Sequence, residues 1–255
     1  THIHGVWHQE WQALYDVVLV AQKSKLPTYE ARRTHGPVRW CPLYGDHQRL
    51  RPPARPRCSE VIFVGNLNAT VNPDRVAFFQ ALQRLTTVSV RQGDYADLYS
   101  ECSIGLNQSL DGELNFRNFE VLASGSALLT EVDLDGMADC LHEGRHFLAY
   151  ERGDAEDCAR VIETMLADPA RVEALRFRGY EEVLSKHLDV HRVDQIETWL
   201  ESWDLDGLVN ARFKAPESWR DSNARVFHYA SQVYQSHGRV REAGIYRSMA
   251  AEVWQ

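Results

Sequence analysis

Residues 117–125 read R-N-F-E-V-L-A-S-G and are followed by the apolar run at residues 127–129. Apolar side chains at helical spacing, closed by a glycine, predict a short helix that ends just before a strand. A polar turn at residues 111–115 opens this helix. In an α/β sheet, the positive end of such a helix lies at the mouth of the sheet, where a phosphate-bearing ligand would bind. By its local pattern alone, the segment is more typical of an ordinary helix-to-strand connection than of a binding site.

The rest of the chain alternates short β-branched runs with amphipathic stretches, which is the pattern of a parallel sheet with crossover helices. Strands are predicted at residues 17–20, 38–41, 61–64, 87–90, 104–106, 127–130 and 147–150. Helices are predicted at residues 5–14, 73–85, 95–101, 117–124, 155–167, 169–186 and 190–203. Asp154 and Asp168 are expected N-caps, the second with Pro169 at the first helical position. The expected fold class is therefore α/β, with a Rossmann-like parallel sheet.

The last forty or so residues change character after Pro216, where two helices are predicted at residues 218–236 and 240–254. Their small and aromatic positions resemble a single tetratricopeptide unit. One such unit cannot bury its faces alone, so it must pack on the main domain, on further repeats or on a protein partner.

Composition excludes several classes of function. A net charge of −8 and a pI near 5.8 argue against binding to nucleic acid. Five cysteines form no Cys-x-x-Cys pair, so a reducing, cytoplasmic location is expected. No stretch has the apolar length of a membrane span. The chain also lacks a Gly-x-Ser-x-Gly elbow, a Walker loop and a Gly-x-Gly-x-x-Gly run, which disfavours hydrolases, P-loop NTPases and dehydrogenases.

The order of several motifs resembles the donor-binding half of GT-B fold glycosyltransferases of the group-1, CgeB-like family. The motifs are residues 99–106, R-N-F-E-V-L-A-S-G-S-A-L-L-T at 117–130 and L-H-E-G-R-H-F-L-A-Y at 141–150, followed by a long helical tail. D-V-V-L-V-A-Q-K at 16–23, P-L-Y-G-D at 42–46 and V-I-F-V-G-N at 61–66 agree with the family's interdomain crossing and first donor-domain strand. The resemblance covers roughly residues 1–200.

The resemblance implies a hexosyltransferase that moves a sugar from a UDP- or GDP-sugar to an unknown acceptor, which is a glycan, a protein or a small molecule. It implies no essential metal and no other cofactor, because positive groups and helix ends stabilise the diphosphate in this fold. The competing hypothesis is a non-catalytic binding or scaffold protein with a degenerate donor domain and a helical partner-binding tail at residues 216–255.

At 255 residues, the chain is longer than one average α/β unit and shorter than two complete Rossmann domains. We interpret residues 1–45 as the remnant of an acceptor-side domain and 46–60 as a linker. Residues 61–205 would form the nucleotide-sugar-binding domain, and 206–255 the helical tail. The linker contains Arg49, Arg51, Arg55 and Arg57 among prolines. This basic cluster is either a solvated hinge or a source of one arginine that steers the donor diphosphate.

The donor site is expected beyond the carboxyl ends of the strands, at the switch point of the sheet. The predicted donor-binding residues are Gly65, Asn66, Asn107, Arg117, Asn118 and Glu120. Gly65 would let the backbone approach a diphosphate, and Arg117 would neutralise its charge with a forked set of donors. The resemblance assigns binding of ribose or sugar hydroxyls to Glu120. The Gly65-Asn66 pair is equally typical of a plain turn at the end of a strand.

One position departs from the family. Its pattern often has two glutamates eight positions apart, and the earlier position, 112, is glycine here, between Asp111 and Glu113. A glycine leaves space for a sugar and offers a backbone N–H.

Histidines supply the catalytic candidates. His2 and His4 lie in the region that the family places near the interdomain cleft, so either imidazole could act as general base toward an acceptor hydroxyl, or the cluster lies at a domain edge. His187 and His191 have the spacing of a zinc-binding pair, but without a third ligand nearby a surface pair is favoured and no metal site is predicted.

Overall fold

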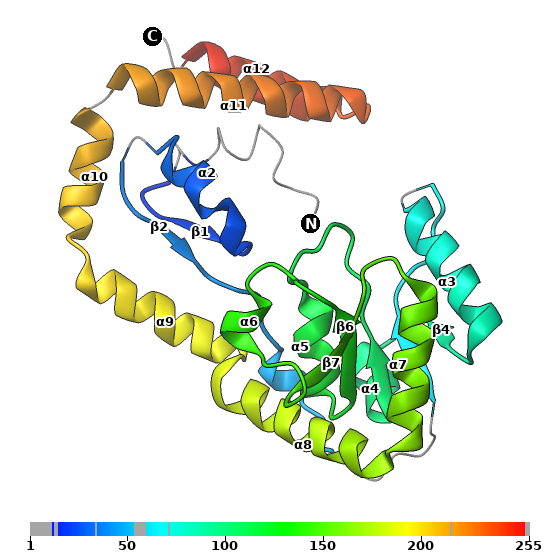
Figure 1. Cartoon of the computed structure of the whole chain (residues 1–255). Coiled ribbons are helices and arrows are strands. Elements are labelled where there is room, and N and C mark those ends of the chain that lie inside the picture. Colours follow the sequence, from blue (N-terminus) through cyan, green and yellow to red (C-terminus); the bar gives the residue numbers. More distant parts are fainter. Residues whose placement is uncertain are drawn as a thin grey trace. The chain divides into compact units, whose positions relative to one another are not determined.

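The computed structural model describes residues 12, 15–33, 35–53, 60–70, 72–214 and 216–252. The chain divides into two compact units (Figure 1). One unit is Pro42–Glu197, and the other combines Thr1–Cys41 with Thr198–Gln255.

The unit Pro42–Glu197 is built on a sheet of five parallel strands in the order β4-β3-β5-β6-β7. The strands are β3 (Val61–Val64), β4 (Ser89–Arg91), β5 (Ile104–Leu106), β6 (Ala127–Glu131) and β7 (Phe147–Tyr150). Every residue of β3, β5 and β6 is buried, as expected for strands covered on both faces of a parallel sheet. The predicted Rossmann-like α/β architecture is therefore confirmed.

The strand order places the switch point of the sheet between β3 and β5. The chain passes from β3 outward to β4 on one side, and then returns to place β5 on the other side of β3. The connections from β3 and β5 thus leave the sheet in opposite directions, and ligands of open α/β sheets commonly bind at the carboxyl ends of two such strands.

Helices connect the strands and cover the sheet (Figure 1). They are η3 (His47–Arg49), α3 (Pro73–Leu85), α4 (Tyr95–Ser100), α5 (Phe116–Ala123), α6 (Met137–Cys140), α7 (Ala155–Ala167), α8 (Pro169–Lys186) and α9 (Asp189–Ser202), whose last residues enter the other unit. Both expected N-caps are confirmed. Asp154 accepts hydrogen bonds from the backbone N–H groups of Glu156 and Asp157, and Asp168 accepts one from Arg171.

The core of this unit lies between the sheet and helices α3, α7 and α8. Phe63 of β3 packs on Phe79 of α3 with ring centroids 4.5 Å apart, and Phe78 stacks on Tyr150 of β7 at 5.7 Å. Burial of a side chain of this size stabilises the fold by about 1.5–3 kcal/mol. The core therefore fixes the carboxyl ends of β3 and β7 relative to α3.

The second unit contains a short parallel pair, β1 (Val18–Val20) and β2 (Val38–Trp40), and the elements η2 (Lys23–Lys25) and α2 (Leu26–Glu30). Its C-terminal part is helical, with α10 (Leu205–Lys214), α11 (Pro216–Ser236) and α12 (Val240–Glu252). Tyr234 of α11 stacks on Tyr246 of α12 with ring centroids 5.2 Å apart, so the last two helices pack as a hairpin. The predicted C-terminal helical hairpin is confirmed.

Some elements differ from the expectation. α2, α6 and α10 were not predicted, because α2 and α6 are short and α10 contains Gly207, a poor helix former. Strand β6 extends one residue beyond the predicted end, to Glu131. The helix predicted at residues 5–14 lies outside the described residues except for Gln12.

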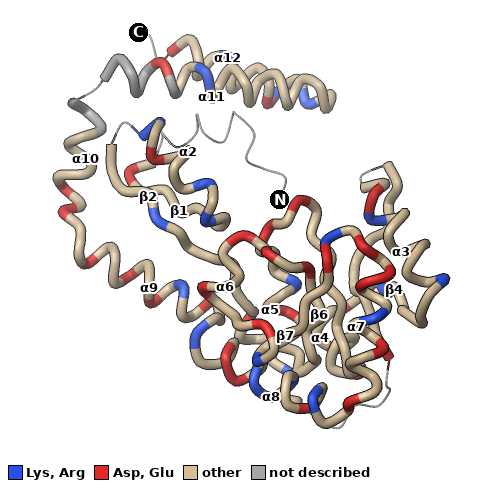
Figure 2. Tube along the Cα trace, in the orientation of Figure 1, with Lys and Arg blue, Asp and Glu red and all other residues tan. Residues whose placement is uncertain are grey.

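Charges are mixed along the unit Pro42–Glu197, where Lys and Arg alternate with Asp and Glu on most helices (Figure 2). Among the described helices, none has both the length and the apolar character needed to span a bilayer.

Candidate functional site

Arg117 lies in the first turn of α5, at the switch point. Its Nε donates to the carbonyl oxygen of Val64 at 3.0 Å, and its Nη1 donates to Oδ1 of Asn107 at 3.2 Å. The guanidinium also lies 4.5 Å from the centre of the Phe63 ring, a cation–π contact. These contacts fix the guanidinium of Arg117 next to the carboxyl ends of both β3 and β5.

Gly65 follows β3 and is in contact with the same group. A Cβ atom at this position would lie 2.7 Å from the Phe63 ring and 3.1 Å from Nη2 of Arg117. Any larger residue would therefore push Arg117 or Phe63 out of place. Asn66, the next residue, is exposed. Glycine is thus required for the close approach of Arg117 to β3.

A second arginine, Arg75 of α3, also contacts the Phe63 ring. This residue was not predicted from the sequence as part of the site. Its Nε donates to Oε1 of Gln108 at 2.6 Å and its Nη2 to the Gln108 carbonyl at 3.0 Å. Its guanidinium lies 5.5 Å from the Phe63 ring centre, so Phe63 contacts both cations. A sequence signal was available, because a cation in the first turn of a helix opposes the helix dipole and needs another reason to be there.

The two arginines bring two positive charges to the same site. Within the described part of the chain, neither Arg75 nor Arg117 forms an ion pair with a carboxylate. Burial, and next the charge of Arg117, lower the pKa of Arg75. A lowered pKa is expected where two guanidinium groups are close and partly removed from water, and an anionic ligand would relieve that repulsion.

Asn107 and Asn118 lie beneath Arg117 in a network of buried amides. The Nδ2 atom of Asn107 donates to Oδ1 of Asn118 at 3.1 Å and to the hydroxyl of Thr130 at 2.9 Å. The Thr130 hydroxyl donates in turn to Oδ1 of Asn118 at 2.9 Å. All three residues have 0% exposure, so this network supports Arg117 from below.

Glu120, one turn further along α5, is half-buried and has no hydrogen bond or ion pair with any described residue. Burial raises its pKa, while the charges of Arg117 and Arg49 act in the opposite direction. An ionised carboxylate only accepts hydrogen bonds, so its ligand must bring a hydroxyl or an N–H group. Glu120 is therefore suited to bind the hydroxyls of a sugar.

The loop at residues 109–115 has a glycine at position 112, and its backbone N–H groups donate to nearby carboxylates. Glu113 accepts the backbone N–H groups of Leu110 and Asp111, the latter at 2.7 Å. Glu131, at the end of β6, accepts the N–H of Ser109 at 2.8 Å. Burial is the main cause that raises the pKa of Glu131.

The histidine predictions have different outcomes. His2 and His4 lie outside the described residues. The interpretation of His187 and His191 as a surface pair is wrong for His187, which is only 7% exposed. His187 is the C-cap of α8, and its Nε2 lies 3.0 Å from the carbonyl oxygen of Cys140, an interaction between segments distant in sequence.

Two arginines of the linker and a cluster of possible metal ligands are engaged in contacts within the protein. Arg49 and Arg51 form ion pairs with Asp94 and Asp97, respectively, so neither is available to steer a diphosphate, and Arg55 and Arg57 lie outside the described residues. Asp46, His47 and Asp189 bring potential metal-ligand atoms within 4.8 Å of one another. However, Nδ1 of His47 is hydrogen-bonded to Asp189 at 2.8 Å, so we assign no metal to this group.

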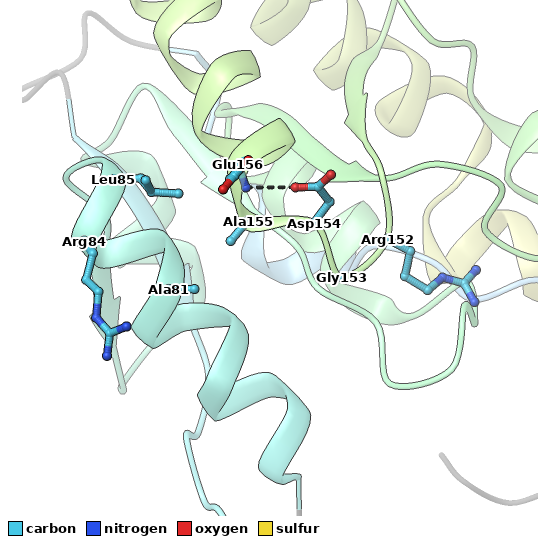
Figure 3. A pocket seen from close by; sticks show the side chains of 8 residues that line it. All are labelled: Ala81, Arg84, Leu85, Arg152, Gly153, Asp154, Ala155 and Glu156. Atoms are coloured by element: carbon cyan, nitrogen blue, oxygen red, sulfur yellow. Dashed lines mark hydrogen bonds between the residues drawn. The ribbon is translucent and has the colours of Figure 1, made fainter.

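An open pocket lies between the end of α3 and the start of α7, lined by Ala81, Arg84, Leu85, Arg152, Gly153, Asp154, Ala155 and Glu156. Its polar groups do not converge (Figure 3): Arg84 and Arg152 point away from each other, and Asp154 is engaged as the cap of α7. We therefore place the candidate site at Arg75, Arg117 and Glu120 instead.

Comparison with solved structures gives the same fold at low sequence identity. HepE from Anabaena in complex with UDP and glucose is 11% identical with a TM-score of 0.61, over 76% of this chain and 65% of that chain. Sucrose-phosphate synthase from Thermosynechococcus elongatus is 16% identical with a TM-score of 0.56, over 76% and 60%. The pneumococcal O-GlcNAc transferase GtfA in complex with UDP and GlcNAc is 12% identical with a TM-score of 0.54, over 76% and 47%. This chain thus spans less than two thirds of each.

No curated protein matches the sequence significantly. A family model described as glycosyl transferase-like matches residues 66–198, which include Arg75, Arg117, Glu120 and the four strands from β4 to β7. The match extends over more than half of the chain. The chain also has the fold of the GT-B glycosyltransferase structures. The chain therefore belongs to the glycosyl transferase-like family.

Proposed function

We propose that this chain binds the nucleotide-sugar donor of a GT-B glycosyltransferase and transfers its sugar to an acceptor. The observation that carries the proposal is the pair of guanidiniums, Arg75 and Arg117, that contact Phe63 at the switch point without a carboxylate partner. A diphosphate supplies the missing negative charge, and the forked donors of arginine match its oxygens.

The same geometry suggests how the residues divide the work. Arg117 and Arg75 would bind the diphosphate and stabilise the charge that develops on it as the sugar leaves. Glu120 would accept hydrogen bonds from hydroxyls of the ribose or of the sugar. Asn107 and Asn118 would act as positioning residues, because they are fully buried and hold Arg117 in place. Two fixed cations supply the charge that a metal supplies elsewhere, so we propose transfer without a metal.

Binding of nucleoside diphosphates tests this proposal directly. UDP and GDP should raise the melting temperature of the chain, and calorimetry should give a dissociation constant for one of them. Arg75→Ala should weaken that binding about tenfold or more, because a hydrogen bond to a charged group contributes about 1.5–3 kcal/mol.

The matched control is Arg84→Ala, on the same helix. Arg84 is exposed and lines the pocket at the end of α3 rather than the candidate site, so its removal should leave the affinity unchanged. If no nucleoside diphosphate binds, or if both variants lose affinity equally, the proposal is wrong and the scaffold hypothesis gains support.

A further inference from the structure

Glu131 is a buried carboxylate with one unused oxygen. It is the last residue of β6 and is only 1% exposed. Its Oε2 accepts hydrogen bonds from the backbone N–H and the hydroxyl of Ser109. Its Oε1 is buried and has no hydrogen-bond partner in the described part of the chain. Such an atom is costly, and proteins retain it mainly where a ligand or a water meets it.

The position of Glu131 connects it to the candidate site. Strand β6 lies next to β5, and Ser109 follows β5 by three residues, so Glu131 and Ser109 meet at the same edge of the sheet as Arg117. Thr130, the residue before Glu131, belongs to the amide network that supports Arg117. Glu131 thus borders the site that we assign to the donor.

The loop beside Glu131 has a glycine at position 112, eight residues before Glu120. This glycine has a φ of 73°, a conformation that L-residues rarely adopt. Its N–H donates to the Ser109 hydroxyl at 2.9 Å, which in turn holds Glu131. The loop is therefore built to hold the Glu131 carboxylate in place.

Arg152 covers this loop from outside. A Cβ atom at Gly112 would overlap its guanidinium, and the side chain points away from Ala81 and Leu85 (Figure 3). Arg152 is exposed and has no hydrogen bond or ion pair with any described residue. Burial raises the pKa of Glu131 and the charge of Arg152 acts in the opposite direction, so the guanidinium lies near Glu131 without a hydrogen bond to it.

We propose that Oε1 of Glu131 binds a hydroxyl group of the donor's sugar. The inference rests on the proposed function. An ionised carboxylate has no hydrogen to donate, so the ligand must bring a hydroxyl or an N–H group, as a neutral hexose or N-acetylhexosamine does. Glu120 and Glu131 then bind different hydroxyls of one donor.

The test compares binding of nucleotide sugars with binding of the diphosphates they contain. Calorimetry on the full chain would use UDP, UDP-glucose and UDP-N-acetylglucosamine, and GDP and GDP-mannose. The wild type should bind at least one nucleotide sugar more tightly than its diphosphate. Glu131→Gln keeps the size of the side chain and an oxygen for Ser109, and should weaken binding of that nucleotide sugar about tenfold while leaving the diphosphate within about twofold.

Two further variants distinguish a direct contact between Glu131 and the sugar from a role of Glu131 in holding the loop. Glu143→Gln, the same substitution at an exposed position between α6 and β7, should change neither affinity. Ser109→Ala should show whether Glu131 acts only by holding the loop, because a purely structural role predicts that this variant and Glu131→Gln reduce both affinities in parallel.

Each outcome has one meaning. Unchanged nucleotide-sugar affinity in Glu131→Gln, an equal loss for the diphosphate, or no gain from the sugar in the wild type would each overturn the inference. In all three cases diphosphate binding by the wild type would still support the proposed function. Absence of any diphosphate binding would contradict the proposed function itself.

Discussion

Two buried polar clusters of the unit Pro42–Glu197 differ in how completely their groups are paired. In the first turn of α9, close to the α8–α9 turn, Arg192 donates to the carbonyl of Pro42 at 3.0 Å, to that of Lys186 at 3.2 Å and to Nδ1 of His187 at 2.9 Å. The Nε2 of His187 lies 3.0 Å from the Cys140 carbonyl. Each polar group there has a partner within the chain.

The cluster at the carboxyl edge of the sheet is incomplete. Arg75 and Arg117 have no carboxylate partner among the described residues, and Glu120 and Oε1 of Glu131 accept no hydrogen bond from them. Burial and charge are of the same kind as at the α8–α9 turn, so these properties alone do not identify a ligand site. Unsatisfied groups do, because an incomplete set of partners is stable only when a ligand or solvent completes it.

The largest expected effect breaks the closed cluster. Arg192→Ala removes three hydrogen bonds and leaves His187 and two carbonyls without a donor, which should reduce the free energy of unfolding by about 3 kcal/mol. Urea unfolding at pH 7 measures this loss, with the exposed Arg178→Ala on α8 as control. Affinity for UDP should stay the same. A loss of UDP affinity without a loss of stability would contradict the distinction between the clusters.

Acid should weaken the same cluster. Burial, and next the charge of Arg192, lower the pKa of His187 from 6.5 to about 4, although Glu182 opposes this shift. The folded chain therefore binds fewer protons than the unfolded chain between these two pKa values, and its stability falls as the pH decreases through that window. The loss should reach at most about 3 kcal/mol by pH 4.

The measurement is urea unfolding at several pH values between 7 and 4. In His187→Gln the curve should be flatter by that amount, because glutamine does not titrate. If both proteins lose stability equally, His187 is not the group responsible.

The open cluster should respond in binding rather than in stability. Arg117→Lys keeps the charge but loses the forked geometry, so UDP should bind about tenfold more weakly. The free energy of unfolding should change by no more than about 1 kcal/mol, since the position is only half-buried. Calorimetry and urea unfolding of the same preparation separate the two effects. If Arg117→Lys lowers the free energy of unfolding but leaves the affinity for UDP unchanged, Arg117 stabilises the fold and does not bind the ligand.

The smallest expected effect is the pH dependence of donor binding. Burial raises the pKa of Glu120, so this carboxyl group gains its proton at a higher pH than an ordinary glutamate and then accepts hydroxyl hydrogen bonds less well. Affinity for the donor should fall a few-fold as the pH is lowered from 7 toward 5. In Glu120→Gln the affinity should be lower at pH 7 and nearly independent of pH. A wild-type affinity that is constant over this range would argue against a contact through Glu120.

Much of the fold could be predicted because its signals are local. The runs at residues 61–64 and 104–106 became β3 and β5, and Asp154 and Asp168 cap their helices as expected. The residues of the candidate site were proposed from the sequence only in part. Arg117 and Glu120 stand in one recognisable motif, whereas Arg75 lies 42 positions before Arg117 and meets it only across the Phe63 ring.

The sequence by itself determined the order of strands and helices, since periodicity, caps and glycine stops act over a few residues. Only the tertiary structure decided which polar groups are satisfied. His187 obtains its partners from Cys140 and Arg192, and Glu131 obtains one from Ser109 and lacks another. Hydrogen bonding between distant segments depends on how the sheet brings their ends together, and no local pattern of residues contains that information.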